Sequence, residues 1–359
     1  MSKTISDFHV IRPAFELKQE DSVGWLAAIH TESSKEPGRH ESFLNILKKI
    51  GLGDQKIQKR GVSLADCFHQ KWDEMEIYHA SVRPEGAGFG KRSQVYDRIG
   101  SDIFERFYPD KAAMPSHLIH VTCTGYVAPS PAQRVVSLRG SGDQTTVTHA
   151  YHMGCYASIP ALRMARGFAE PADIVHTEIC SLHLNPNLHE IDQLVVQTLF
   201  ADGFIKYTVK PEGLGFRILS LEERIIPETS DAMHWVCQDW GFKMKLEKEV
   251  PVRIARALPS FVAKLLEKAK VNGSEIYFAI HPGGPKIIQQ VAKILELRPE
   301  QFEQSQWVLQ NHGNMSSATL PHIWERLWND ERVKPGSYIV SLAFGPGLTL
   351  AGGVFECVR

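Results

Sequence analysis

His281-Pro282-Gly283-Gly284 and, further along the chain, Gly313-Asn314-Met315-Ser316-Ser317 carry more information about the fold than any other stretch. The apolar run 276–280 before the first segment predicts a strand that ends at His281. Pro285 then stands near the first position of a following helix, where its missing N–H is not needed. We therefore expect His281 at a strand tip, with its imidazole projecting into the space that the connecting loops enclose.

Outward from these segments, strand-like and helical patterns alternate along the chain. We expect strands at 117–123, 173–184, 204–209, 276–280, 337–344 and 348–358, and helices at 132–138, 191–200, 252–270, 286–295 and 316–328. Alternation of this kind predicts α/β layers with mixed sheets and buried central strands. Because the second part of the pattern repeats the first, two similar halves stacked together are expected.

The composition is that of a globular chain that can bury a large core, with 359 residues of which 43% are hydrophobic. Lys and Arg total 40 against 41 for Asp and Glu, so no overall field steers the chain toward nucleic acid. Residues 1–15 lack the apolar centre of a secretory signal, and no apolar stretch reaches the length of a membrane span. We expect a cytoplasmic protein with no nucleic-acid or membrane partner and six reduced cysteines.

Cys155 is the candidate nucleophile. It opens a run with helical spacing, 155–166, in which Pro160 is tolerable only in the first turn. We therefore place Cys155 at a helix start, where the helix dipole and the free N–H groups favour the thiolate. The alternative is a small buried residue that only fills space beneath the helix.

With Cys155, the side chains of His281 and Asn314 supply the thiol, imidazole and carboxamide needed for acyl transfer through a thioester. A neutral amide can donate to an oxyanion without becoming a proton source, which suits an enolate intermediate. Taken alone, each residue also has a structural explanation. His281 could cap its strand through a backbone hydrogen bond, and Asn314 could be a helix N-cap or occupy a left-handed turn.

Two other patterns are incomplete. The segment 86–91 resembles a phosphate loop, but its first Gly is misplaced and Arg92 stands where Ser or Thr should bind magnesium. Two pairs of histidines are closely spaced, His117 with His120 and His149 with His152. Neither pair has the cysteine or carboxylate pattern that would complete a zinc site. We expect no metal site.

From Val121 to the carboxyl terminus, the chain resembles the type III polyketide synthases, the chalcone-synthase-like branch of the thiolase superfamily. Five segments in the family's order carry the resemblance, namely Gly154-Cys155, Leu199–Gly203, His281–Pro285, Gly313–Ser317 and Phe344–Thr349. The resemblance implies a homodimer with a five-layered αβαβα thiolase-like fold. It also implies two pseudo-equivalent halves, 1–220 with the nucleophile and 221–359 with the catalytic His and Asn.

By this resemblance, Cys155 receives the acyl starter, His281 maintains the thiolate, and Asn314 shares with His281 the donor role during malonyl decarboxylation. The implied reaction is iterative decarboxylative condensation of malonyl-CoA onto the acyl group, followed by cyclisation or hydrolysis. Alkylpyrones or alkylresorcinols from a fatty acyl starter are the expected products. Acyl-CoA and malonyl-CoA are substrates, no cofactor is implied, and an acyl carrier protein is the alternative malonyl donor.

The resemblance also assigns the substrate pocket. Phe200 matches an aromatic gatekeeper, Met244 replaces a second gatekeeping Phe, and Trp235 stands where Gly is common. Ala128 occupies the place of a Met that reaches across the dimer in plant relatives. The other cavity positions are Thr124, Cys180, His183 and Ser316. Trp235 is expected to narrow the chamber and to shift its volume toward a tunnel for an aliphatic chain.

A basic stretch near the amino terminus matches the family's contact with coenzyme A phosphates at the tunnel mouth. It contains Lys56, Lys59 and Arg60. Ammonium and guanidinium groups suit phosphate. The alternative is an ordinary solvated helix face.

Two other functions remain open at the level of sequence. A ketoacyl synthase that initiates fatty-acid synthesis uses the same three residue types but performs a single condensation. A non-catalytic scaffold would keep the fold and bind acyl thioesters without turnover. Intact Cys155, His281 and Asn314 argue against the scaffold.

Overall fold

The largest element of the fold is a mixed sheet of nine strands, within the described residues 2–52, 57–271 and 275–359 of the computed structural model. Its strands are β1 (Lys3–Ile11), β4 (His117–Thr122), β5 (Thr146–Tyr151), β6 (Ala172–Glu178), β7 (Gly203–Pro211), β8 (Gly215–Ile225), β11 (Ile276–Ile280), β12 (Tyr338–Gly345) and β13 (Thr349–Val358). Their order across the sheet is β11-β12-β13-β8-β1-β7-β6-β4-β5. Strand β4 is parallel to β5 and β6, and β11 is parallel to β12.

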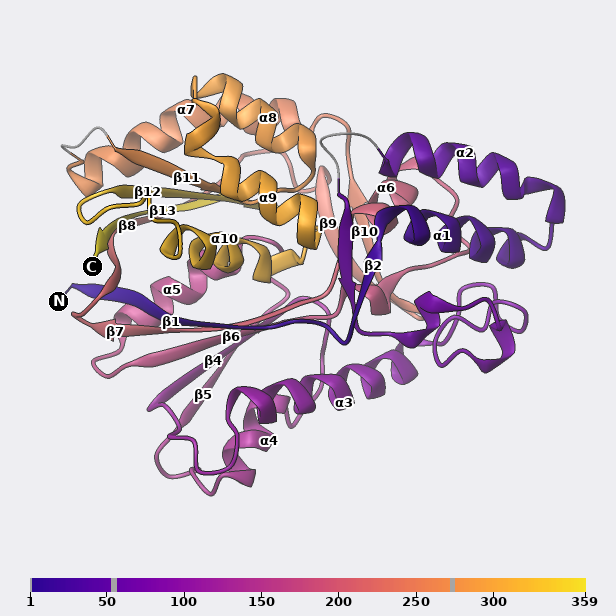
Figure 1. Cartoon of the computed structure of the whole chain (residues 1–359), viewed down its shortest axis with the longest axis horizontal. Coiled ribbons are helices and arrows are strands. Elements are labelled where there is room, and N and C mark those ends of the chain that lie inside the picture. The colour runs from indigo at the N-terminus through magenta and orange to yellow at the C-terminus, as the bar shows by residue number, and fades with distance from the viewer. Residues whose placement is uncertain (1, 53–56, 272–274) are drawn as a thin grey trace.

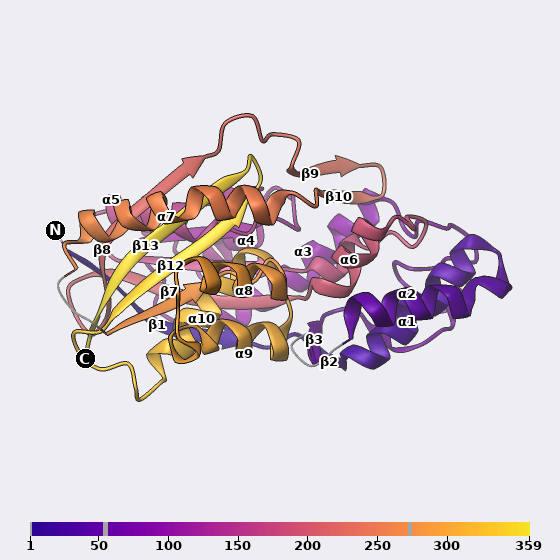
Figure 2. The same ribbon diagram turned by 90° about the horizontal axis from the view of Figure 1, so that it is seen from above.

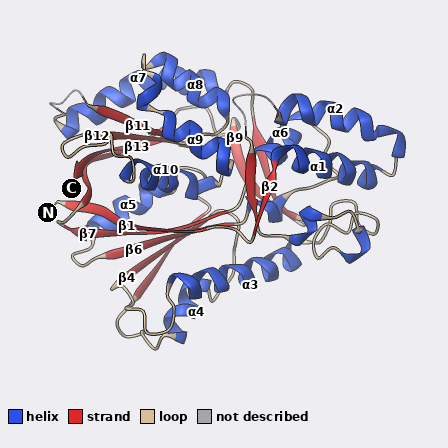
Figure 3. Cartoon of the chain, in the orientation of Figure 1, coloured by secondary structure: helices blue, strands red, loops and turns tan. Residues whose placement is uncertain are grey.

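The sheet doubles back where β1 pairs with β8, so that its two parts face each other as separate layers (Figure 1). Two helices lie between these parts, α5 (Ser158–Gly167) and α10 (Thr319–Trp328). One outer face is covered by α7 (Val250–Ala269) and α8 (Pro285–Ile294). The other outer face is covered by α3 (Phe89–Phe107) and α4 (Pro131–Leu138). Figure 3 shows the same alternation of helical and strand layers. The expected five-layered α/β architecture is therefore confirmed.

Burial on several sides explains the composition of the central elements. Every residue of β6 is buried, and α10 buries most of its positions, with Trp324 fully enclosed. A helix that is apolar around most of its circumference is stable only inside a protein. The one polar group of Trp324, the indole N–H, donates to the hydroxyl of Ser341 at 2.7 Å. The middle layer thus fixes the spacing between the two parts of the sheet.

A second group of elements extends from one end of the layers (Figure 2). It consists of α1 (Gln19–Ser34), α2 (His40–Gly51), α6 (Ile191–Leu199) and the paired strands β2 (Phe15–Lys18) and β3 (Lys59–Val62). The hairpin β9 (Met233–Gln238) and β10 (Gly241–Leu246) packs against α6. Helix α9 (Glu303–His312) lies beside α8 and α10 and also contacts β3. These elements enclose the end of the layers at which the candidate site lies.

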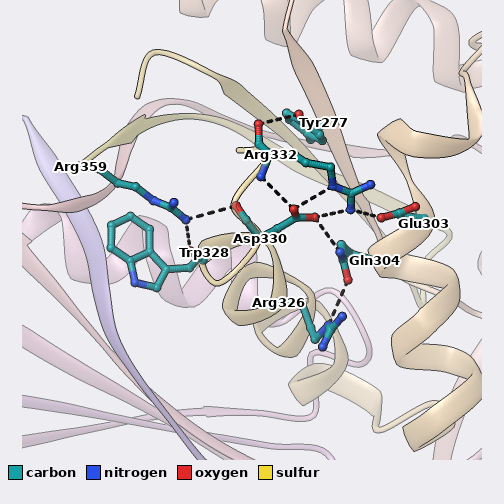
Figure 4. A network of polar contacts seen from close by, with 8 residues as sticks. All are labelled: Tyr277, Glu303, Gln304, Arg326, Trp328, Asp330, Arg332 and Arg359. Carbon is teal, nitrogen blue, oxygen red and sulfur yellow. Dashed lines mark hydrogen bonds and ion pairs between the residues drawn. The ribbon is translucent and has the colours of Figure 1, made fainter. Parts of the chain in front are cut away.

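A polar network ties the last residues of the chain to α9 and α10 (Figure 4). The Arg332 guanidinium contacts both Asp330 and Glu303, and Gln304 donates to Asp330 at 2.7 Å. The C-terminal Arg359 donates to the carbonyl of Trp328 and lies over its ring, 4.8 Å from the centroid. The pKa of Asp330 is lowered to about 2, mainly by its hydrogen bonds from Arg332.

Most of the expected strands and helices from residue 117 onward are present, with two corrections. The strand expected to reach Leu184 ends at Glu178, because the chain then turns into a 3₁₀ segment, Cys180–His183. Helix α5 begins at Ser158, so Cys155 lies in the turn before the helix and not in its first turn. Pro160 does occupy the first turn of α5, as its missing N–H requires.

The proposed division near residue 220 stays a prediction. Residue 220 lies within β8, which pairs with both β13 and β1. None of the helices in the described ranges is both long and apolar enough to span a bilayer.

Candidate active site

A small apolar cavity lies beside Cys155. Its walls are formed by Cys123, Thr124, Gly154, Cys155, Cys180, Phe200, Met233, His234, Trp235, Met244, Ser316 and Pro346. About 30 Å³ is open to the centre of a water molecule. The cavity therefore brings together the candidate nucleophile and six of the residues assigned to the substrate pocket, namely Thr124, Cys180, Phe200, Trp235, Met244 and Ser316.

Cys155 is held at the cavity wall by close packing of the turn before it. Gly154 has φ +80°, and an added Cβ there would come within 2.5 Å of Pro346 Cδ. The left-handed backbone and the close approach both require glycine. The Cys155 thiol is 8% exposed and lies 4.0 Å from the Ser316 hydroxyl. Burial raises the pKa of Cys155 to about 12, although Ser316 and Asn314 act in the opposite direction.

Asn314 is buried with a fixed amide. Its backbone N–H donates to the Leu199 carbonyl at 3.1 Å, and its own carbonyl accepts from the N–H of Ala201 at 2.8 Å. The amide oxygen Oδ1 accepts from the Ser316 N–H at 2.9 Å. With Oδ1 engaged in this way, the Asn314 NH₂ group remains as a donor, and a hydrogen bond from Asn314 contributes to the Cys155 pKa.

His281 ends β11, as the sequence predicts, and its backbone N–H donates to Leu342 at 2.8 Å. The residue is 1% exposed, and neither ring nitrogen has a hydrogen-bond partner among the described residues. Burial lowers the pKa of His281 to about 3. A buried imidazole without partners is costly, so the ring is available to a ligand or to the Cys155 thiol after a side-chain movement.

The pKa directions do not support a resting ion pair between these two residues. The pKa of Cys155 is raised and that of His281 is lowered, both mainly by burial, so the neutral thiol and the neutral imidazole are favoured. The expected stabilisation of the Cys155 thiolate by the helix dipole is also weakened, because Cys155 precedes the first residue of α5 by one turn.

Glu178 is a buried carboxyl group that organises this region and that the sequence reasoning did not single out. It accepts hydrogen bonds from the Cys123 N–H and the Thr124 hydroxyl, both at 3.0 Å, and from the Ser317 hydroxyl. Burial raises its pKa, and these donors oppose the rise. Glu178 thus connects the end of β4 with the Asn314–Ser317 segment. Glu178 is the last residue of β6, a strand that also contains Asp173, His176 and Thr177, so no clean apolar run marked it in the sequence.

Trp235 on β9 closes one side of the cavity. Its indole N–H donates to the Cys123 carbonyl at 2.8 Å, and its ring lies 5.7 Å from that of Phe242. Across the hairpin, Met244 pairs with Trp235, and the Met244 carbonyl accepts from Gln193 on α6 at 2.7 Å. Both side chains therefore reach the cavity from a hairpin that is anchored on two sides.

Several predicted substrate residues lie outside the cavity wall. His183 is buried behind it, where its ring contacts Phe242 and bonds to the Thr124 carbonyl at 2.8 Å. Ala128 is exposed, next to the cis bond with Pro129. Residues that the sequence reasoning missed as cavity wall are Cys123, Gly154, Met233, His234 and Pro346.

Two residues of the basic stretch assigned to coenzyme A phosphates, Lys59 and Arg60, lie next to each other on β3 but differ in exposure. Lys59 is partly exposed and pairs with Glu16 at 2.8 Å. Arg60 is 5% exposed and donates to backbone carbonyls inside the protein, so it cannot contact a phosphate at a tunnel mouth. Successive strand residues point to opposite faces, which explains the difference. Lys56 lies outside the described residues.

Among the described residues, no group of three or more His, Cys, Asp or Glu side chains is placed to hold a metal ion. The cavity wall contains thiols, hydroxyls and apolar groups instead. The arrangement of a thiol beside amide and hydroxyl donors suits transfer of an acyl group.

Comparison with known proteins agrees with this chemistry. The family model for the C-terminal domain of chalcone and stilbene synthases matches residues 217–359. A 1,3,6,8-tetrahydroxynaphthalene synthase from Streptomyces griseus is 28% identical over 279 residues, which cover 73% of this chain and 74% of that protein. The chain is thus similar to the chalcone-synthase-like, type III polyketide synthases.

Other relatives in the family are larger proteins. Probable polyketide synthase 1 from Dictyostelium discoideum is 30% identical over 253 residues, covering 66% of this chain but only 8% of that protein. The match thus spans a small part of the Dictyostelium sequence. Both matches are to proteins that make polyketides or are named polyketide synthases, which are transferases.

Solved structures of the family show the same fold. The C-terminal type III polyketide synthase domain of Steely1, from a Dictyostelium type I/III hybrid, aligns with a TM-score of 0.85 at 22% identity over 100% of both chains. The 1,3,6,8-tetrahydroxynaphthalene synthase from Streptomyces coelicolor aligns with a TM-score of 0.82 at 23% identity over 99% of both chains. The thiolase-like fold expected from the motifs is confirmed.

Proposed function

We propose that this protein condenses malonyl units iteratively onto an acyl group bound to Cys155, with loss of carbon dioxide at each round. The observation that carries the proposal is the shared cavity of Cys155, Ser316 and Phe200, with the Asn314 amide fixed beside the thiol. The similarity to polyketide synthases supports the same chemistry. Substrates are acyl-CoA and malonyl-CoA, and an acyl carrier protein is the alternative donor of the malonyl group.

In the loading step, the Cys155 sulfur attacks the thioester carbonyl of the starter, and coenzyme A leaves as a thiol. Because the resting thiol and imidazole are neutral, His281 takes the Cys155 proton as the sulfur–carbon bond forms and returns it to the leaving sulfur. In an empty site such contacts are often long and tighten when substrate binds. The transfer requires the unpartnered His281 ring to approach the thiol.

In the extension step, the malonyl thioester loses carbon dioxide and leaves an enolate. The Asn314 NH₂ group and His281 donate hydrogen bonds to the enolate oxygen. The fixed Oδ1 of Asn314 keeps the NH₂ group pointing away from Ser316. The enolate carbon then attacks the acyl thioester on Cys155, which releases the Cys155 sulfur and lengthens the chain by two carbons.

For the products, alkylpyrones or alkylresorcinols from a fatty acyl starter remain our first proposal. The cavity around Cys155 has space for only water-sized molecules in this conformation, so a long chain requires the wall at Phe200 or Trp235 to open. A compact aromatic product from malonyl-CoA alone is the second candidate. It is supported by two Streptomyces relatives that are named 1,3,6,8-tetrahydroxynaphthalene synthases.

A panel of acyl-CoAs of increasing chain length, each with excess malonyl-CoA, tests the proposal when products are identified by mass spectrometry. Products with several malonyl-derived units are expected, and Cys155→Ala is expected to yield none. One β-ketoacyl thioester as the sole product would instead identify a single-round ketoacyl synthase. Acyl-CoA binding without a Cys155-linked adduct would identify a non-catalytic scaffold.

The quaternary structure and location follow from the same proposal. We propose a cytoplasmic homodimer, as the family resemblance implies. Sedimentation equilibrium at micromolar protein is the direct measurement, and a monomer at all concentrations would reject the dimer.

A further inference from the structure

Arg60 lies inside the protein, directly behind the segment that carries Phe200. Its Nη1 donates to the carbonyls of Gln197 at 2.9 Å and Phe200 at 2.5 Å, and its Nη2 donates to the Ser22 hydroxyl. These contacts join β3 and α1 to the carboxyl end of α6, where the last carbonyls of the helix have no partners within the helix. The guanidinium therefore fixes the main chain at Phe200.

The other edge of the same segment is paired with Asn314. The N–H of Asn314 donates to Leu199, and the carbonyl of Asn314 accepts from Ala201. Residues 199–201 are thus held between Arg60 on one side and the Asn314 backbone on the other. The Arg60 stem also touches the Asn314 loop, because an added Cβ at Gly313 would lie 3.1 Å from Arg60 Cγ.

Phe200 lines both the cavity beside Cys155 and a second small cavity. The other residues that line the second cavity include Arg60, Trp25 and Cys67. A shift of the main chain at residue 200 would therefore change the wall of the reaction cavity directly.

The charge of Arg60 remains in place at neutral pH. Burial lowers its pKa to about 10, and the nearby Cys67 and Asp202 oppose the fall. Asp202 is itself fixed by the N–H groups of Ser63 at 2.6 Å and Ser181 at 2.8 Å. A buried cation is retained only where its contacts compensate for lost hydration, and here those contacts converge on the Phe200 segment.

We propose that Arg60 is a positioning residue for extension: it sets the main chain that places both Phe200 and Asn314 at the reaction cavity. The inference rests on the proposed function, because it assigns Arg60 to the decarboxylation step. It also differs from phosphate recognition, which would require Arg60 at the surface.

The experiment compares Arg60→Lys, which keeps the charge but loses the two-pronged donor, with Arg166→Lys, the same change at an exposed position in the last turn of α5, as the matched control. Loading of Cys155 by acyl-CoA and release of carbon dioxide from malonyl-CoA are measured separately. For Arg60→Lys, we expect decarboxylation kcat to fall by about 10- to 100-fold, as for a displaced catalytic group, and loading to fall far less. Arg166→Lys is expected to leave both steps at wild-type rates.

Two further measurements separate positioning from its rivals. With N-acetylcysteamine thioesters, which lack the phosphates of coenzyme A, the same loss is expected; a loss confined to coenzyme A substrates would overturn the inference. In an Asn314→Ala background, Arg60→Lys is expected to add little, because both changes act through one amide. If the losses of the two single variants multiplied in the double variant, the inference would be overturned.

The outcomes also separate this inference from the function on which it rests. If wild-type protein released no carbon dioxide from malonyl thioesters, the proposed function and this inference would both fail. An active wild type with an unchanged Arg60→Lys variant would overturn the inference alone. Equal losses of loading and decarboxylation, accompanied by a lower unfolding temperature, would reduce Arg60 to a structural residue.

Discussion

The indole N–H of Trp235 donates a 2.8 Å hydrogen bond to the main-chain carbonyl of Cys123, across the cavity beside Cys155. The bond connects the β9–β10 hairpin to the end of β4, so the Trp235 ring is fixed in the cavity wall. A large side chain with one fixed orientation sets the space available to an acyl chain.

Replacement of Trp235 by Gly is therefore expected to shift the preferred starter toward longer acyl-CoAs. Trp235→Phe removes the N–H donor but keeps most of the ring, and we expect an intermediate shift. The measurement is kcat/KM across acyl-CoAs of increasing length. Val236→Ala, at an exposed neighbouring position of the same strand, is the control and is expected to keep the wild-type preference. An unchanged preference in Trp235→Gly would contradict the role of Trp235 in the wall.

The raised pKa of Cys155 predicts slow alkylation of the resting protein at neutral pH. We expect its iodoacetamide rate to keep rising beyond pH 9, and the exposed Cys237 serves as the accessible reference thiol. Peptide mass spectrometry assigns the rate of each thiol. A Cys155 rate that is already constant near pH 7 would instead support a resting thiolate paired with protonated His281.

Asn314→Ala removes the amide donor but leaves the thiol and His281. We expect Cys155 to load normally and malonyl decarboxylation to fall by about 10²- to 10³-fold, the usual effect of removing one oxyanion donor. Intact-protein mass and carbon dioxide release measure the two steps. The control is Asn311→Ala on α9, whose amide bonds only to the Trp307 carbonyl in the described contacts. Equal loss of both steps in Asn314→Ala would contradict the role assigned to the amide.

Buried histidines predict a loss of stability in mild acid. Burial is the main cause that lowers the pKa values of His176 to about 3 and of His30 and His322 to about 4. Between these values and the ordinary pKa of about 6.5, the unfolded chain binds protons that the folded chain does not, so stability falls as pH falls through this window. Each such histidine contributes a slope of up to about 1.4 kcal/mol per pH unit.

Urea unfolding between pH 7 and pH 4.5 measures this slope. His322→Gln is expected to reduce it by up to one proton's contribution, whereas the exposed His40→Gln is expected to leave it unchanged. Stability that is constant or rises on acidification would show that these histidines are protonated in the folded state.

The network around Asp330 predicts a contribution to stability far from the cavity (Figure 4). Asp330→Asn keeps the shape but removes the charge that Arg332 and Gln304 contact, and we expect a loss of about 1–3 kcal/mol. Glu74→Gln, in the exposed pair with Lys71, is the control and is expected to cost less than about 1 kcal/mol. Equal effects of the two changes would show that the network adds nothing to an ordinary surface pair.

Local patterns predicted the parts of the fold that local physics determines. The apolar run before His281 specified both a strand and its end, and the first-turn position of Pro160 was also predicted correctly. Helix α1 was not predicted, because its buried side includes polar residues. Gln19, for example, is buried since its amide donates to the Thr198 carbonyl at 2.7 Å, a contact that only the tertiary structure creates.

The candidate site shows the same limit. Motifs located Cys155 and the cavity residue Phe200, because these residues lie in recognisable segments, whereas Trp235 was assigned from its matched position in the family outside those segments. Glu178 was missed because its importance depends on donors from distant segments of the chain. Arg60 was assigned to the surface because two adjacent basic residues resemble a charged patch, whereas alternation along β3 turns only Lys59 outward.

The contact of Gly154 with Pro346 joins segments that are nearly two hundred residues apart in the chain. The nucleophile turn is therefore shaped by the connection between β12 and β13. A displacement of that connection would also move Cys155, so binding events at the β12–β13 turn would be felt directly at the thiol.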